Sequence, residues 1–135
     1  MGNSEDLPNL NASHLSAGLQ WLELMSAEGK WNLRHEEKLK LLGNISDSEL
    51  DVLYLLNECD PLNEFERSVM ERLALLVLIA KNSAALVGVE FYCELFNRKN
   101  SNQIFNNHSI KSYLLGSESV EDLYVVVRYL ENSVR

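Results

Sequence analysis

The three histidines are the side chains of this sequence best suited to acid–base or metal chemistry. His14, His35 and His108 lie far apart along the chain. His35 begins a segment that resembles the zinc motif His-Glu-x-x-His, in which the second histidine shares a helix face with the first. Leu39 stands where that second histidine would be needed. We therefore predict no zinc site, and we interpret residues 34–38 as the solvated first turn of a helix.

Paired carboxylates and thiols are the remaining candidates for catalysis. Glu36-Glu37 and Glu121-Asp122 fall where helices are expected to begin, and a carboxylate there stabilises the helix dipole. Cys59 and Cys93 form no Cys-x-x-Cys pair, so we expect two small, buried or half-buried thiols. The sequence has neither a glycine-rich phosphate loop nor a Gly-x-Ser-x-Gly motif. It therefore predicts a binding protein without catalytic residues, metal or cofactor.

The elements that position these residues are predicted to be helices. Apolar residues recur at three- and four-residue spacing, which is typical of amphipathic helices. The expected helical segments are 14–28, 34–42, 46–57, 64–82, 83–97 with a break near Gly88, 109–115, and a last helix after Ser119. Residues that can cap these helices stand at their expected starts: Ser13, Ser46, Asn63, Ser109 and Ser119. Leu73–Ala80 is apolar on all sides, which predicts a buried central helix.

The predicted fold class is all-α: a compact multi-helix bundle without a sheet or an internal repeat. We expect a flexible tail at residues 1–12, then a helical part at 13–60 that resembles a degenerate helix-turn-helix. Residues 61–135 are expected to form the C-terminal helical domain. The length of 135 residues and the hydrophobic fraction of 46% suffice for a packed core.

Charge and hydropathy narrow the class of partner. The net charge of −8 is uneven, because residues 1–96 contain 7 Lys and Arg against 16 Asp and Glu, whereas residues 97–135 contain 5 against 4. An acidic body disfavours nucleic acid and anionic membranes as general partners. The longest apolar run, Leu73–Ala80, is much shorter than the ~20 residues that span a bilayer. The first residues also lack the features of a signal peptide, so we expect a cytoplasmic protein.

The predicted helices at 34–42 and 46–57 are arranged like a helix-turn-helix, which raises the possibility of DNA recognition. The second of them would enter the major groove, yet it contains Asp47, Glu49 and Asp51 and no Lys or Arg. Carboxylates there would face a polyanion. We therefore interpret the pair as helices that pack in the bundle and no longer read DNA.

The aromatic residues of the C-terminal third allow two interpretations. Phe105, Tyr113, Tyr124 and Tyr129 could all belong to the core, or the tyrosines could contact a partner protein, where they are enriched. Asn106-Asn107, within the polar segment 98–108, predicts a turn, because asparagine tolerates positive φ better than most residues.

The order of motifs in the last third resembles the C-terminal domain of the Xre/MbcA/ParS-like antitoxins. That pattern contains an aromatic residue with Arg-Pro-Asn, Phe-x-Gly-x-Ser, Met-Leu-x-Gly, and Leu-Tyr-x-Val-Arg-x-Tyr-Leu-Asp. The corresponding segments here are Phe96-Asn97-Arg98-Lys99-Asn100, Phe105-Asn106-Asn107-His108-Ser109, Tyr113-Leu114-Leu115-Gly116, and Leu123-Tyr124 with Val126-Val127-Arg128-Tyr129-Leu130-Glu131. Lys99 replaces the proline, Asn107 the glycine, and Val127 the first arginine of the family's closing motif.

This resemblance implies an antitoxin whose partner is a RES-domain toxin that consumes NAD. In the family, the C-terminal end of the antitoxin blocks the active-site cleft of the toxin, and the antitoxin is usually a homodimer. The residues that the resemblance places at this interface are Arg98, Asn100, Arg128, Tyr129 and Arg135. Two alternatives remain: a DNA-binding autorepressor of its own operon, and a helical interaction module without a toxin.

Overall fold

Helices make up most of the described chain, which confirms the predicted all-α class. The computed structural model describes residues 11–117 and 119–134. Its helices are α1 (Ala12–Met25), α2 (His35–Leu41), α3 (Asp47–Tyr54), α4 (Glu64–Val87), α5 (Tyr92–Asn97), the 3₁₀ helix η2 (Gln103–Phe105), α6 (Ile110–Leu115) and α7 (Val120–Val134). The described residues form no sheet and contain two isolated antiparallel bridges, Asn11–Pro61 and Lys99–Ser109.

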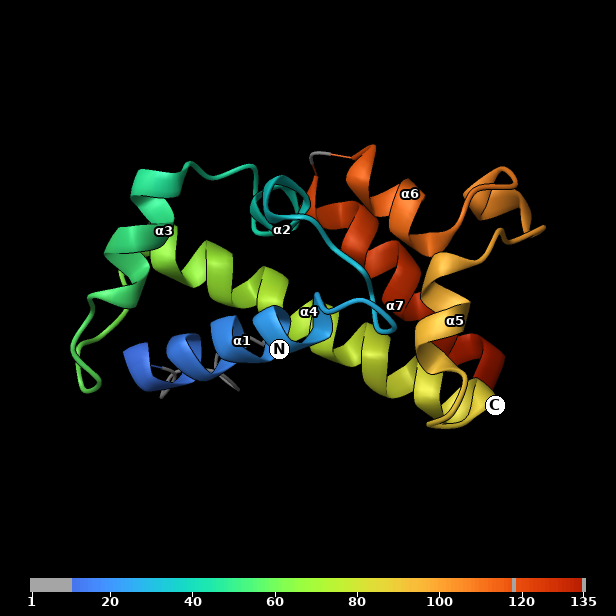
Figure 1. Ribbon diagram of the computed structural model, residues 1–135, viewed down its shortest axis with the longest axis horizontal. Helices are drawn as coiled ribbons and strands as arrows, with labels where there is room; N and C mark the ends of the chain where they lie inside the picture. The colour runs from blue at the N-terminus through green and yellow to red at the C-terminus, as the bar shows by residue number, and fades with distance from the viewer. Residues whose placement is uncertain (1–10, 118, 135) are drawn as a thin grey trace.

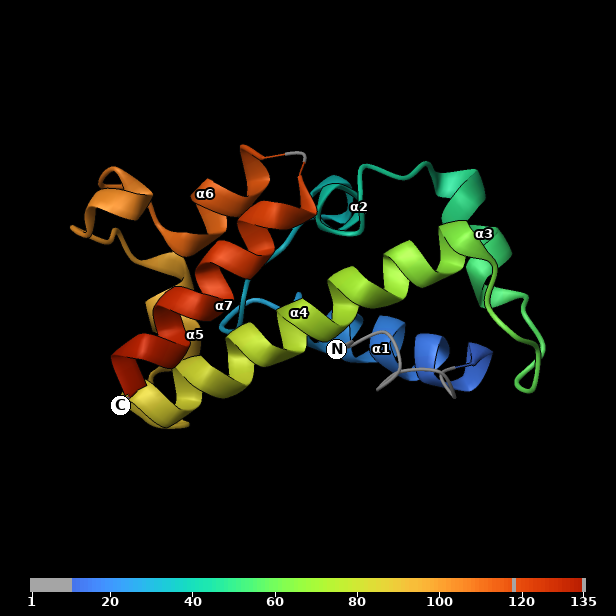
Figure 2. The same ribbon diagram turned by 180° about the vertical axis from the view of Figure 1, so that it is seen from behind.

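The long helix α4 is the axis of the bundle (Figure 1). α7 lies along its C-terminal half, and α1 and α5 also pack against it. α3 stands at one end of the molecule, whereas α5, the loop after it and the end of α7 lie at the other (Figure 2). The C-terminal third is therefore built on the second half of α4.

The helix starts follow the capping residues of the sequence. Asn63 and Glu66 at the start of α4 each accept a hydrogen bond from the other's backbone N–H, at 2.8 and 2.9 Å. Ser46 caps α3 in the same way, and Ser109 caps α6. The start of α1 was predicted wrongly: Asn11 caps it, its carboxamide oxygen accepting from the Ser13 N–H at 3.0 Å. Asn11 is thus the N-cap of α1 and the buried Ala12 its first residue, so neither belongs to the predicted tail, whose residues 1–10 lie outside the described residues.

Two helix boundaries also differ from the prediction. α1 ends at Met25, before the expected end at residue 28. α4 continues to Val87 and ends at Gly88, whose φ of +94° is a conformation that favours glycine. The predicted break near Gly88 is therefore confirmed, while the predicted end of the helix at residue 82 is wrong.

One hydrophobic core crosses both predicted parts of the chain. Leu15 and Trp31 from the first part belong to the same buried cluster as Leu73, Phe96 and Leu130 from the second. Trp31 stacks on Phe96, with ring centroids 4.0 Å apart and planes inclined by 10°. The segment between α1 and α2 is thereby joined to α5.

The middle of α4 is less buried than predicted. Leu73, Leu76 and Ile79 are fully buried, but Val77 and Leu78 remain 38% and 36% exposed. The other helices cover one side of α4 and leave the opposite side open to solvent (Figure 2). The prediction of burial on all sides is therefore wrong at these two positions.

The two helices interpreted as a degenerate helix-turn-helix have different principal neighbours. α2 packs against α6, and α3 packs against α1. The contact between their starts is polar: His35 Nε2 lies 2.5 Å from Asp47 Oδ1, and both side chains are more than half exposed. Within the described residues, no helix is both long enough and apolar enough to cross a membrane.

Candidate protein-binding surface

The segment between α5 and α6 is an ordered loop built by its own asparagines. The Asn100 N–H donates to the His108 carbonyl at 3.1 Å, and the Asn100 side-chain oxygen accepts from the Asn102 N–H at 2.9 Å. Asn106 and Asn107 have φ values of 50° and 69°, which confirms the predicted turn of positive φ. Backbone geometry therefore explains the abundance of asparagine here.

Phe105 anchors this loop to the helices beneath it. Its side chain is fully buried. Its ring meets the rings of Tyr113 on α6 and Tyr129 on α7 edge to face, with centroids 5.3 and 5.1 Å away. Edge-to-face pairs of this kind stabilise by about 0.5–1.5 kcal/mol beyond the area they bury. The loop is thus held in a fixed position over α6 and α7.

Two of the three C-terminal tyrosines use their hydroxyl groups inside the molecule. Tyr113 donates to Asp122 at 2.9 Å, and Tyr124 donates to Glu71 on α4 at 2.5 Å. Burial, and then the bond to Asp122, raises the pKa of Tyr113 to about 12. The bond to Glu71, followed by burial, raises the pKa of Tyr124 to about 12. Both tyrosines therefore fit the core interpretation.

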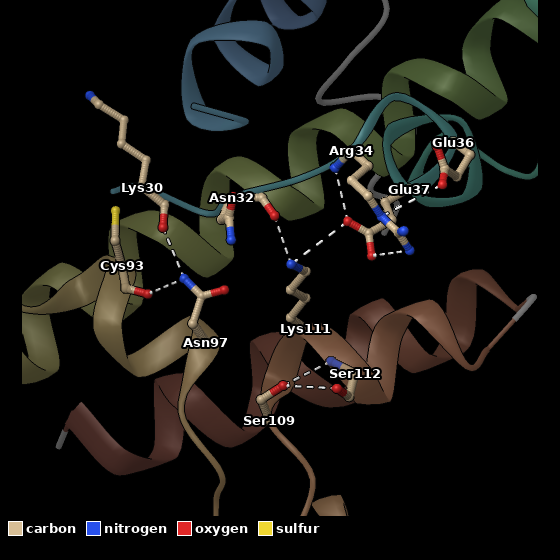
Figure 3. Close-up of polar contacts among 10 residues, drawn as sticks. All are labelled: Lys30, Asn32, Arg34, Glu36, Glu37, Cys93, Asn97, Ser109, Lys111 and Ser112. Carbon is tan, nitrogen blue, oxygen red and sulfur yellow. Dashed lines mark hydrogen bonds and ion pairs between the residues drawn. The ribbon is translucent and has the colours of Figure 1, made fainter. Parts of the chain in front are cut away.

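A polar seam joins α5 and α6 to the segment between α1 and α2 (Figure 3). The Asn97 amide nitrogen donates to the Lys30 and Cys93 carbonyls, both at 2.9 Å. The Lys111 ammonium donates to the Asn32 carbonyl at 2.7 Å and lies 3.7 Å from the Glu37 carboxylate. This seam fixes the orientation of the two short helices that flank the loop.

Glu37 is the central acceptor of the seam. Its side chain is only 14% exposed, and it accepts the Arg34 N–H at 2.9 Å. Burial alone would raise the pKa of Glu37. The bond from the Arg34 backbone and the charges of Lys111 and Arg34 outweigh burial, so the net pKa of Glu37 lies below its ordinary value. Glu37 therefore stabilises the fold as a carboxylate.

The structure places the predicted interface residues in the same half of the molecule but in different environments. Arg98 is 58% exposed and lies 4.0 Å from the Glu94 carboxylate, and Arg128 is exposed on α7. Asn100 stabilises the loop through its hydrogen bonds, and the half-buried Tyr129 does so by packing against the Phe105 ring. Arg135 lies outside the described residues.

Exposed apolar side chains lie at the end of the molecule where α7 terminates. In the turn between α4 and α5, Val89 is 77% and Phe91 53% exposed. Val134 in the last turn of α7 is 42% exposed, and both views place the end of α7 beside that turn (Figures 1 and 2). Exposed apolar groups concentrated at one place are typical of protein interfaces. This feature was not predicted from the sequence, in which Val89 and Phe91 beside Gly88 were the available signal.

The remaining candidates for chemistry have structural or solvent-exposed positions. His14 accepts the Asn11 N–H at the start of α1, and His108 is exposed. Cys93 is half-buried as expected, but Cys59 is exposed, because the turn before α4 leaves it outside the core. Groups of three or more His, Cys, Asp or Glu able to hold a metal ion are absent from residues 11–117 and 119–134.

Comparison with protein-family models, curated proteins and solved structures found no match to this chain.

Proposed function

We propose that this chain is a protein-binding module of the antitoxin type, which neutralises a RES-domain, NAD-consuming toxin. The observation that carries the proposal is the set of exposed apolar side chains Val89, Phe91 and Val134 on adjoining elements at the end of α7. A binding site for a protein needs apolar groups that lose water when the partner arrives. The resemblance of the last third to Xre/MbcA/ParS-like antitoxins supplies the class of partner.

Exposed arginines on the C-terminal elements suit a partner with a polar, charged cleft. Arg98 and Arg128 are exposed in the same half of the molecule, within residues 97–135, which contain 5 Lys and Arg against 4 Asp and Glu. A guanidinium binds carboxylates and phosphates through two parallel hydrogen bonds. In this proposal, α7 and the turn before α5 dock on the toxin, and residues 133–135 enter its active-site cleft.

α7 is held against the body of the molecule, which fixes the direction of its C-terminal end. Leu130 is fully buried, and the bond from Tyr124 to Glu71 ties α7 to α4. A pre-organised docking element loses less conformational entropy on binding. Rigidity of α7 therefore favours the C-terminal end as the inhibitory element.

The test measures NAD consumption by a purified RES-domain toxin from the same genome, with and without this protein. Full-length protein should inhibit. Deletion of residues 133–135 should abolish inhibition without unfolding, because Ser133 and Val134 are exposed. Phe91→Ser should weaken binding by about tenfold, the loss expected for one exposed apolar anchor. Leu24→Ser, which alters a 68% exposed residue on α1, is the matched control.

The outcomes separate the parts of the proposal. If the folded truncated protein still inhibits fully, the C-terminal end is not the inhibitory element. If Phe91→Ser and Leu24→Ser inhibit as well as the wild type, the apolar end is not the docking surface. If the full-length protein does not bind the toxin, the antitoxin proposal is wrong.

A further inference from the structure

The outer side of α3 and the residue that ends it carry apolar side chains that remain exposed among the described residues. Leu53 faces the core and is 2% exposed. Val52 in α3 and Leu55, the residue that caps its C-terminal end, are three positions apart and are 54% and 81% exposed. This surface lies at the end of the molecule away from α5 and from the end of α7 (Figures 1 and 2). It is therefore separate from the surface of the proposed function.

Three carboxylates belong to the same helix as Val52. Asp47, Glu49 and Asp51 on α3 are all exposed. From Leu41 to Glu66 the sequence contains seven Asp and Glu and no Lys or Arg. A partner that covers Val52 and Leu55 must accordingly present positive charge around its own apolar groups.

We propose that the outer side of α3 docks a cationic amphipathic segment of another protein, with leucine-like side chains on Val52 and Leu55 and Lys or Arg opposite the carboxylates. An amphipathic helix presents such a pattern on one face. Duplex DNA and anionic membranes are poor occupants, because the carboxylates repel them. The same face of a second copy is a poor occupant for the same reason, since it brings carboxylates against carboxylates.

The experiment uses a labelled helical peptide of leucine and lysine, with leucines at i, i+3, i+4 and i+7, and measures its fluorescence anisotropy with the full chain. The matched peptide has glutamate in place of every lysine. The lysine peptide should bind and the glutamate peptide should not. Leu55→Ser and Val52→Ser should each weaken binding about tenfold, as expected when one apolar contact is lost. Asp51→Asn should weaken binding and reduce its dependence on salt.

Two controls and one independent measurement make the result decisive. Leu24→Ser and Glu131→Gln remove an exposed leucine and an exposed carboxylate elsewhere, and neither should change the affinity. Hydrogen exchange of the wild type should show that the peptide protects residues 47–56, which requires no variant to fold. The proposal is overturned if the lysine peptide does not bind or protects another region, or if the controls weaken binding as much as Leu55→Ser does. It is also overturned if Leu55→Ser dissolves a homodimer, or if duplex DNA binds this face.

Discussion

At the scale of single residues, the ion pair between Lys111 and Glu37 stabilises the packing of α6 against α2. Both side chains are largely covered, with exposures of 18% and 14%. Each also makes a hydrogen bond with the backbone of the segment between α1 and α2. Charges that are covered in this way depend on their partners much more than exposed charges do. The seam should therefore respond to pH through Glu37.

Acid should destabilise the protein in part by protonating Glu37. Because the folded pKa of Glu37 is lowered, its contribution is complete above the ordinary value of 4.5 and is lost as the pH falls through the folded pKa. Glu37→Gln should thus be less stable than the wild type near neutral pH, and the difference in free energy of unfolding should shrink on acidification. Urea denaturation at a series of pH values measures this difference.

Glu36→Gln is the control, because Glu36 is 67% exposed one residue away on the same helix. Its stability should stay close to that of the wild type at every pH. A Glu37→Gln difference that is constant with pH would contradict the role given to the carboxylate.

At the scale of elements, the turn between α4 and α5 determines where the exposed apolar side chains lie. Gly88 ends α4 with φ +94° and ψ 156°, and the chain then turns into α5 within a few residues. Val89 and Phe91 are exposed because they occupy this turn and not a helix face. The conformation of Gly88 therefore supports both the fold and the proposed docking surface.

Gly88→Ala should lower the free energy of unfolding by about 1–3 kcal/mol, the cost of a side chain in a conformation that is nearly restricted to glycine. Steric overlap does not contribute, since a Cβ at Gly88 would have no atom within 4 Å. Gly116→Ala is the comparison: Gly116 has φ −84°, and its Cβ would meet only ordinary contacts, the nearest at 3.4 Å. Its cost should stay within about 0.5 kcal/mol. Chemical denaturation of both variants provides the test, and equal costs would exclude backbone strain at Gly88.

At the scale of the whole molecule, one side of α4 has apolar side chains that the other helices do not cover. Val77 and Leu78 are partly exposed in the middle of the longest helix. The remainder of the core is continuous from α1 to α7, so this surface is not a gap between domains. Apolar surface of this kind can be buried by a second copy.

We expect the protein to self-associate through this side of α4. Sedimentation equilibrium should give a mass above the 15.4 kDa of one chain, and Leu78→Lys should return the mass to that of the monomer. Leu24→Lys places the same charge on the exposed side of α1 and should leave the association unchanged. A wild type that remains strictly monomeric at high concentration would refute this expectation.

Local patterns in the sequence determined the helical elements and several of their ends. Ser46, Asn63 and Ser109 cap the helices that were predicted from them, and Asn106-Asn107 forms the predicted turn. These features were predictable because a cap or a turn involves residues within about four positions of each other. The missed cap at Asn11 is of the same kind, but Ser13 is an equally good capping residue two positions later.

Only the tertiary structure decided which surfaces are open and which residues meet. Phe105 meets Tyr129, Lys111 meets Asn32 and Glu37, and Tyr124 meets Glu71, all across separations that contain other helices. Similarly, the sequence could not distinguish the exposed Val77 and Leu78 from their buried neighbours, because all of them are apolar. Periodicity identifies a helix that has an apolar side, but the neighbouring helices determine how much of that side is covered.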